Sequence, residues 1–279
     1  MNAIIPKPKV SVVTTVYNGE DYFDRAVPSI LNQEFTNFEW LIVDDGSTDS
    51  TPIFLADLAT KDDRVKILSP GRLGFAKALN YAISQAQGDY IARQDFDDSS
   101  YSNRFLCQVE LLEANSDVGI VGCHYLVKDE NRGEEYIRQI PQSHKDLSRM
   151  LAKCIPFAHT LVMFRKQCWT EAGGYPELDD IEDLRLWITF AKLGWRLSSV
   201  SDVLGAHWVH PKSFWHSNFE YSRRQKKLMK IQWQAIRELN LPFWMIIYPL
   251  GRYFYFNSPK QLKKVLRRVL AGSKEKDVE

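Results

Sequence analysis

The chain has 279 residues, of which 44% are hydrophobic, so it can bury a core for one large α/β domain or two smaller ones. The formal net charge of +1 is unevenly distributed: residues 1–209 carry 21 Lys and Arg against 30 Asp and Glu, whereas residues 210–279 carry 15 against 5. The four cysteines stand singly, without spacing that suits zinc or a disulfide framework. The N-terminus lacks the charged start and long apolar run of a signal peptide, so we expect a cytoplasmic protein.

Strand-like and helix-like segments alternate over the first hundred residues. Apolar, β-branched runs predict strands, and apolar residues at helical intervals predict helices between them. The expected strands lie in residues 10–18, 38–47 with a turn at its end, 64–68, and 89–98, where the strand gives way to an acidic cluster. The expected helices cover 20–33, a segment starting at Ser50 or Thr51, and 74–87. Pro28 predicts a kink or break in the first helix, and Gly88 is the expected C-cap of the third. This alternation is typical of a doubly wound parallel sheet, in which ligands bind beyond the carboxyl ends of the strands.

The alternation weakens after residue 100. We expect a helix over Asn103–Ala114, strands around residues 118–127 and 159–165, and a helix over Ile181–Leu193 that ends at Gly194. No internal repeat or low-complexity linker interrupts the sequence. This arrangement is typical of a substrate-binding half appended to the first.

Three carboxylates follow the fourth expected strand directly. The segment RQDFDDSS contains Asp95, Asp97 and Asp98, whose like charges repel unless they are exposed, hydrogen-bonded or neutralised by a cation. Mg²⁺ and Mn²⁺ take one or two carboxylates together with phosphate oxygens and water, so a DxDD at a strand end suits such an ion. The alternative is a solvated acidic turn.

The segment VDDGSTDS at the end of the second expected strand has two interpretations. Asp, Gly and Ser build turns and cap helices, which would explain the segment structurally. Alternatively, a carboxylate such as Asp45 accepts a hydrogen bond from a nucleobase or ribose. A phosphatase with an aspartyl nucleophile is disfavoured, because Asp44 has no carboxylate two residues later.

Two further clusters combine a structural and a functional interpretation. The segment DDIEDLRLW has four carboxylates at an expected helix start: Asp179, Asp180, Glu182 and Asp183. They stabilise a helix N-terminus, or one of them serves as a general base held on a rigid element.

The segment HWVHPKSFWH has three histidines among aromatic residues: His207, His210 and His216. Packed histidines explain it as well as ligands do, and zinc would need a tighter set.

Five segments occur in the order and spacing of one family: VSVVTTVYNGEDYFDRAVPSILNQEF, FEWLIVDDGSTD, GFAKALNYAISQAQGDYIARQDFDD, HTLVMFRKQCWTEAGGY and EDLRLW. The chain thereby resembles a family 2 glycosyltransferase over residues 9 to about 213. The resemblance implies a GT-A fold, with a Rossmann-like, mostly parallel central sheet and helices on both faces. It also implies a nucleotide-sugar-binding half over residues 1–98, an acceptor-binding half with the base motif over 99–217, and a helical, basic and aromatic C-terminal extension over 218–279.

The resemblance assigns the donor side of the site. It implies that Thr15, Tyr17, Asp45, Arg93 and Asp95 bind the nucleotide sugar. Asp97 is implied as a direct ligand of Mn²⁺ or Mg²⁺.

Further metal and catalytic roles follow from the same resemblance. Asp95 is implied to lie near the metal or the ribose, and Asp98 could complete the metal shell. His210 is implied to reach the metal or the diphosphate, although a looser match leaves that role open to His207. Asp183 is implied as the catalytic base, with Glu182 orienting or bonding the acceptor.

Two residues are assigned to the acceptor side. His159 lies where acceptor-contacting residues occur in the family. Trp187 could stack on a sugar face, while a core tryptophan on helix 181–193 is the competing interpretation.

The C-terminal tail is apolar, aromatic and basic. Residues 242–256 are too short and too interrupted to span a bilayer, which needs about 20 apolar residues. A basic amphipathic segment follows, so residues 242–271 predict association with an anionic membrane surface, consistent with the lipid-linked acceptors common in bacterial members of the family. Packing on the body or on a second subunit, as in a homodimer, stays open. Nucleic acid is disfavoured because no nucleic-acid-binding fold accompanies the charge.

We therefore expect an inverting, metal-assisted glycosyltransferase at the inner face of the plasma membrane. It would move a sugar from a nucleoside diphosphate sugar, with UDP preferred on family grounds, to an acceptor hydroxyl in polysaccharide or lipid-linked glycan synthesis. The alternatives are a catalytically silent sugar-nucleotide binding module and a nucleotidyltransferase. The nucleotidyltransferase would need a glycine-rich, basic phosphate loop after the first strand, where this chain has TTVYNGEDY.

Overall fold

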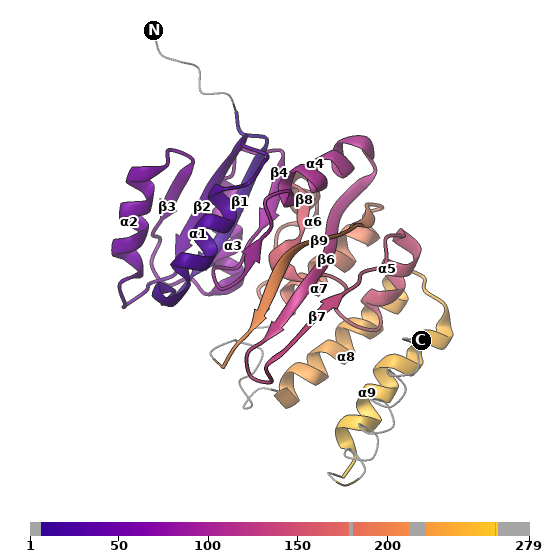
Figure 1. The fold of residues 1–279 in the computed structure, drawn as a ribbon. Helices are drawn as coiled ribbons and strands as arrows, with labels where there is room; N and C mark the ends of the chain where they lie inside the picture. Colours follow the sequence, from indigo (N-terminus) through magenta and orange to yellow (C-terminus); the bar gives the residue numbers. More distant parts are fainter. Residues whose placement is uncertain (1–6, 179–180, 212–220, 260, 262–279) are drawn as a thin grey trace.

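The computed structural model describes residues 7–178, 181–211, 221–259 and 261 (Figure 1). Within them a single sheet of nine strands runs through the molecule in the order β3-β2-β1-β4-β8-β6-β9-β5, with β7 paired to β6. The strands are β1 Val10–Val16, β2 Phe38–Asp44, β3 Val65–Leu68, β4 Tyr90–Arg93, β5 Ser99–Ser100, β6 Val118–Asp129, β7 Glu134–Arg138, β8 Met163–Arg165 and β9 Arg196–Val209.

The first four strands are parallel, as expected for a doubly wound sheet. The direction then changes, because β8 is antiparallel to both β4 and β6, while β9 lies parallel to β6. β1, β2 and β3 therefore end at the same edge as β4, from which the acidic loop begins.

Helices pack on both faces of the sheet (Figure 1). One apolar cluster joins β1 and β2 to α1, α2 and α4, and the other joins the sheet to α3, α5, α6, α7 and α8. Burial on both faces explains the nearly continuous apolar strands of the sequence. The helices are η1 Glu20–Tyr22, α1 Phe23–Leu31, α2 Thr51–Lys61, α3 Phe75–Gln85, α4 Arg104–Ala114, α5 His144–Leu151, η2 His159–Leu161, α6 Lys166–Ala172, α7 Glu182–Lys192, α8 Tyr221–Glu238, η5 Phe243–Ile246 and α9 Ile247–Asn257.

Three local expectations need correction. Of the kink or break expected at Pro28, the break does not occur: a 3₁₀ turn, η1, leads into α1, which stays helical through Pro28 to Leu31. The expected strand at 159–165 is half 3₁₀ helix, since η2 precedes the short strand β8. Gly88 does not cap α3, which ends at Gln85.

Gly88 has a different role, which is close approach to β1. Its N–H donates to the Ser11 hydroxyl at 2.8 Å, and a Cβ at this position would lie 2.6 Å from the Ser11 backbone nitrogen. No side chain fits at such a distance unless the backbone moves.

The C-terminal extension is helical in its described part. α8 packs against α7 and α9 packs against α8 (Figure 1). The expected basic amphipathic helix beyond α9 lies almost entirely outside the described residues. The described part contains no helix long and apolar enough to cross a membrane.

We predict that Gly88→Ala destabilises the protein by about 1–3 kcal/mol, because the added methyl group overpacks against the β1 backbone. Urea unfolding of both proteins measures the difference. Gly251→Ala in α9 is the control, since a Cβ there meets no atom within 4 Å and alanine favours a helix. Equal stability of Gly88→Ala and the wild type would contradict this account of Gly88.

Candidate active site

The loops after β1 and β2 are hydrogen-bonded to each other. The Asn18 N–H donates to the Ser47 hydroxyl at 2.9 Å, and the Thr48 N–H donates to Asn18 Oδ1 at 2.8 Å. The Ser50 N–H donates to Glu20 at 2.9 Å. The turn-forming residues of TVYNGEDY and DDGSTDS thus form two hydrogen-bonded loops that make a common rim at the carboxyl ends of the strands.

Asp45 fixes a third loop against this rim. Its carboxylate accepts the N–H of Leu73 at 2.6 Å and that of Gly74 at 3.1 Å. The preceding residue, Arg72, lies with its guanidinium 3.7 Å from the ring centroid of Tyr17, whose side chain is about half exposed. An exposed, stacked cation and ring form a platform suited to a planar base or a phosphate.

Two of the residues expected to bind the nucleotide sugar, Tyr17 and Asp45, lie at this edge of the sheet. Thr15, a third, lies half-buried near the end of β1. Arg72 was not expected. The sequence signal for it was an arginine between two glycines in PGRLG, after the third strand and therefore at the same sheet edge.

Arg93 lies fully buried beneath the acidic loop. Its guanidinium donates to the Val13 carbonyl at 3.0 Å and to the Asp95 carboxylate, and its Nε has no hydrogen-bond partner among the described residues. Burial raises the pKa of Asp95, an effect that Arg93 opposes and Asp97 reinforces. Arg93 therefore supplies the nearest compensating charge for Asp95.

A second buried arginine, Arg104, holds the backbone of this loop. It donates to the carbonyl oxygens of Arg93 at 2.7 Å and Val162 at 3.1 Å, and to the side chains of Gln94 at 3.0 Å and Ser100 at 2.7 Å. These acceptors are neutral, and burial lowers the pKa of Arg104 to about 10, so the side chain stays charged at neutral pH. Arg104 thus fixes both ends of the 94–100 loop.

His207 of β9 and His210, which directly follows β9, both reach the acidic loop. His210 Nε2 lies 2.9 Å from Asp97 Oδ2, and the opposite ring nitrogen lies 3.4 Å from the Tyr22 hydroxyl. His207 Nδ1 lies 3.0 Å from Asp98 Oδ2. The sequence left open which histidine reaches the metal ligands; in the structure His210 pairs with Asp97.

Asp98 is fully buried and both its oxygens are engaged, because Oδ1 also accepts the Trp208 N–H at 2.7 Å. Burial acts to lower the pKa of His207, but the charges of Asp98, Asp95 and Asp97 outweigh it and raise this pKa to about 9. Asp98 therefore anchors β9 through the Trp208 N–H and pairs with a protonated His207.

Asp183 lies in the first turn of α7 and is buried together with Glu182. Ile181 immediately before them has φ 65°, a left-handed conformation that costs a β-branched residue about 1–3 kcal/mol. Burial raises the pKa of Asp183 to about 6, and the charge of Asp95 adds to the increase. The protonation of Asp183 and that of Asp95 therefore depend on each other.

His159 and Trp187 belong to an aromatic group beside this helix. His159 Nε2 lies 2.8 Å from the hydroxyl of Tyr175, and its ring contacts Phe75 edge-on at 5.9 Å. Burial, aided by Arg93, lowers the pKa of His159 well below its usual value, so the ring is neutral. Trp187 has no exposed surface and packs on Phe164, so stacking on an acceptor sugar is corrected to a core role.

The acidic loop contains the donor atoms that a divalent cation would use. Among the residues that the structure describes, no three His, Cys, Asp or Glu side chains lie close enough to hold an ion by themselves. Asp97 and His210 nevertheless present a carboxylate and an imidazole nitrogen 2.9 Å apart, with Asp97 partly exposed. This donor set fits an ion that takes one or two protein ligands and completes its shell with phosphate and water.

The sequence comparisons identify the family. The model of glycosyl transferase family 2 matches residues 11–169. EpsE of Bacillus subtilis (strain 168), which is named as a glycosyltransferase, is 34% identical over 257 residues, covering 88% of this chain and 90% of EpsE. The O-antigen biosynthesis glycosyltransferase WbnJ of Escherichia coli is 32% identical, covering 76% of this chain and 84% of WbnJ. The chain belongs to glycosyltransferase family 2, and it is a glycosyltransferase.

Solved structures share the fold. Residues 1–349 of S. aureus TarS in complex with UDP-GlcNAc superpose with a TM-score of 0.68 at 21% identity, covering 89% of this chain and 73% of that one. The mannosyltransferase PcManGT from Pyrobaculum calidifontis, in complex with GDP-Man and Mn²⁺, gives a TM-score of 0.63 at 21% identity, covering 96% and 81%. The expected GT-A fold is confirmed, and the nucleotidyltransferase alternative is set aside.

We predict that Arg104→Met lowers the free energy of unfolding by about 3–5 kcal/mol, because it leaves several buried acceptors unpaired. Chemical denaturation measures the loss. Arg64→Met is the matched control, since Arg64 pairs with Asp62 in a partly exposed site and its loss should cost about 1 kcal/mol or less. Similar losses in the two variants would show that Arg104 does not hold the loop.

Proposed function

We propose that this glycosyltransferase is an inverting enzyme that moves a sugar from a nucleoside diphosphate sugar to an acceptor hydroxyl in surface-polysaccharide or lipid-linked glycan synthesis. The observation that carries the proposal is a partly exposed acidic loop in the same site as a buried carboxylate, Asp183, at the start of α7. The charge of Asp95 in that loop helps to raise the pKa of Asp183. The names of WbnJ and of the TarS and PcManGT complexes support the pathway class and the donor class.

The donor is proposed to lie across the carboxyl ends of β1, β2 and β4. Tyr17 and Arg72 would contact the base or ribose, with Asp45 holding the loop that carries Arg72. Arg93 and Asp95 would lie below the sugar diphosphate. UDP stays the preferred nucleotide on family grounds, since neither Tyr17 nor Arg72 by itself discriminates one base from another.

Asp97 and His210 are the residues that would hold Mn²⁺ or Mg²⁺, and Asp95 would approach through water or the ribose. When bound, such an ion would offset the negative charge that develops on the leaving diphosphate. His207, whose raised pKa keeps it protonated at neutral pH, adds a fixed positive charge beside Asp98.

Asp183 is proposed as the general base. Its carboxylate would take the proton of the acceptor hydroxyl while that oxygen bonds to the anomeric carbon from the face opposite the diphosphate. The bond between the anomeric carbon and the phosphate oxygen breaks at the same time, and its electron pair leaves with the nucleoside diphosphate. Glu182 and His159 would orient the acceptor, His159 as a neutral ring.

We predict that the rate of transfer falls as the pH drops below about 6, because protonated Asp183 cannot accept the hydroxyl proton. Asp183→Asn should bind donor normally and lose transfer by at least about 100-fold. A coupled assay for nucleotide release, with calorimetry for donor binding, separates the two effects. Full transfer by Asp183→Asn would remove Asp183 as base.

The same variant has a stability signature. A pKa raised from 3.8 to about 6 means that folding favours the protonated form, so this contribution is present below pH 3.8 and is lost as the pH rises through about 6. Asp183→Asn should therefore stabilise the unliganded protein at pH 8 by up to about 3 kcal/mol, and by less at pH 5. Denaturation at both pH values measures this, and a pH-independent difference would contradict it.

For the donor and metal, we predict that one nucleoside diphosphate raises the melting temperature by several degrees when Mn²⁺ is present, because ligands that bind only the folded state stabilise it. A panel of UDP, GDP, dTDP and CMP, each with and without Mn²⁺, tests this. Asp97→Ala should abolish the metal-dependent shift, whereas the surface variant Asp117→Ala should keep it. An Mn²⁺-dependent shift that survives in Asp97→Ala would exclude Asp97 as a ligand.

A further inference from the structure

Apolar side chains form an exposed stripe along η5 and α9. Phe243 is 76% exposed, Ile247 62%, Leu250 44% and Phe254 66%. At 100° per residue the three positions in α9, which are Ile247, Leu250 and Phe254, lie within an arc of roughly 60° on an ideal α-helix. Phe243 and Trp244, the latter 58% exposed, precede them in the 3₁₀ helix η5. Large apolar side chains gathered on one short segment are more than the scattered exposed residues of an ordinary surface.

The opposite face of the same segment fixes its orientation. Met245 and Pro249 are buried, and Arg252 donates to the side chains of Gln225 and Gln232 on α8. Because α9 is anchored to α8 on this side, the apolar stripe lies on the side that faces solvent.

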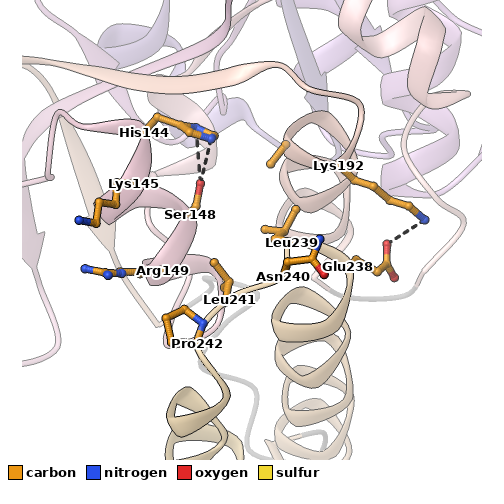
Figure 2. Close-up of a pocket in the computed structure, with 11 residues that line it drawn as sticks. His144, Lys145, Ser148, Arg149, Lys192, Glu238, Leu239, Asn240, Leu241 and Pro242 are labelled. Atoms are coloured by element: carbon orange, nitrogen blue, oxygen red, sulfur yellow. Dashed lines mark hydrogen bonds and ion pairs between the residues drawn. The ribbon is translucent and has the colours of Figure 1, made fainter.

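Cations lie next to the start of the stripe. Pro242, which precedes η5, lines a pocket of about 470 Å³ together with Lys145 and Arg149 of α5 and Lys192 of α7 (Figure 2). Lys192 pairs with Glu238, and Arg149 forms a long, exposed ion pair of 4.0 Å with Asp146. Lys145 and Arg149 both extend from α5 beside Pro242 (Figure 2). This pocket is separate from the candidate active site, because Lys192 is at the other end of α7 from Asp183, about 14 Å along the helix axis.

The C-terminal region that contains the stripe has a net positive charge. Residues 210–279 carry 15 Lys and Arg against 5 Asp and Glu, while the rest of the chain is acidic. A stripe of Phe, Trp, Ile and Leu bordered by cations is the combination that inserts shallowly into a bilayer interface containing anionic lipids.

We propose that η5 and α9 form a docking surface for an anionic phospholipid membrane. Phe243, Trp244, Ile247, Leu250 and Phe254 enter the headgroup–acyl boundary, while Lys145 and Arg149 contact lipid phosphates. The inference does not depend on the proposed catalytic roles, because it concerns a surface on a different part of the molecule.

A second copy of this chain is the competing occupant. A two-fold symmetric contact places the same patch of each copy opposite itself, which brings the bordering cations of the two copies toward one another. An anionic lipid surface neutralises those cations instead, which favours the membrane.

Sedimentation of the full chain with sucrose-loaded vesicles tests the proposal. The wild type should bind vesicles of 30% phosphatidylglycerol in phosphatidylcholine at least tenfold more strongly than pure phosphatidylcholine. Phe243→Ser/Ile247→Ser/Phe254→Ser should bind the anionic vesicles at least tenfold more weakly than the wild type. All three side chains are exposed, so the variant should fold, and its melting curve checks this.

Two further variants complete the design. Ile53→Ser/Tyr136→Ser/Ile137→Ser removes exposed apolar side chains from α2 and β7 and should bind like the wild type. Lys145→Glu/Arg149→Glu should weaken binding to the anionic vesicles several-fold and reduce its salt dependence.

The proposal is overturned if the wild type fails to bind the anionic vesicles, or if the stripe variant binds as well as the wild type. Light scattering adds a third outcome: a wild-type dimer that becomes monomeric in the stripe variant, with unchanged vesicle binding, would assign the stripe to a contact between copies.

Discussion

Arg93 and Arg104 are both fully buried, Arg104 is hydrogen-bonded to the Arg93 carbonyl, and the acidic loop is built on them. Carboxylates as close as Asp95, Asp97 and Asp98 repel one another, and a loop that carries them would otherwise open toward water. Arg93 offsets the charge of Asp95 directly, whereas Arg104 binds the loop's carbonyl oxygens and polar side chains. The cost of burying two guanidinium groups is offset by hydrogen bonds that a lysine could not reproduce with the same planar geometry.

The second half of the chain contributes the partners of these carboxylates. β9 pairs with β6 and β5, and its end brings His207 to Asp98 and the following His210 to Asp97. Arg25 of α1 reaches the same region, with its guanidinium 3.5 Å from the Trp208 ring centroid and a hydrogen bond of 2.8 Å to the Asp97 carbonyl. The site is thus closed by contacts between segments almost two hundred residues apart, which makes its geometry a property of the whole fold.

Asp183, the proposed general base, is held in its position at the expense of stability. Burial raises its pKa to about 6, and the residue before it takes a left-handed backbone conformation. Both features cost folding free energy, and such strain persists where the surrounding structure over-determines it. Around α7 the packing is dense, since Leu184, Trp187 and Ile188 are fully buried.

The sequence by itself determined the parallel half of the sheet, the acidic loop at its carboxyl edge and the family, because strand periodicity, strand-end carboxylates and motif order are local properties. It favoured a core role for Trp187, which burial confirms, but it did not determine that Asp98 anchors β9 or that Asp45 holds the Arg72 loop. Those outcomes depend on which side chains the fold brings together and on how much water it removes from them. Gly88 shows the same limit: the glycine was visible in the sequence, but only packing against Ser11 decided that it serves close approach rather than helix capping.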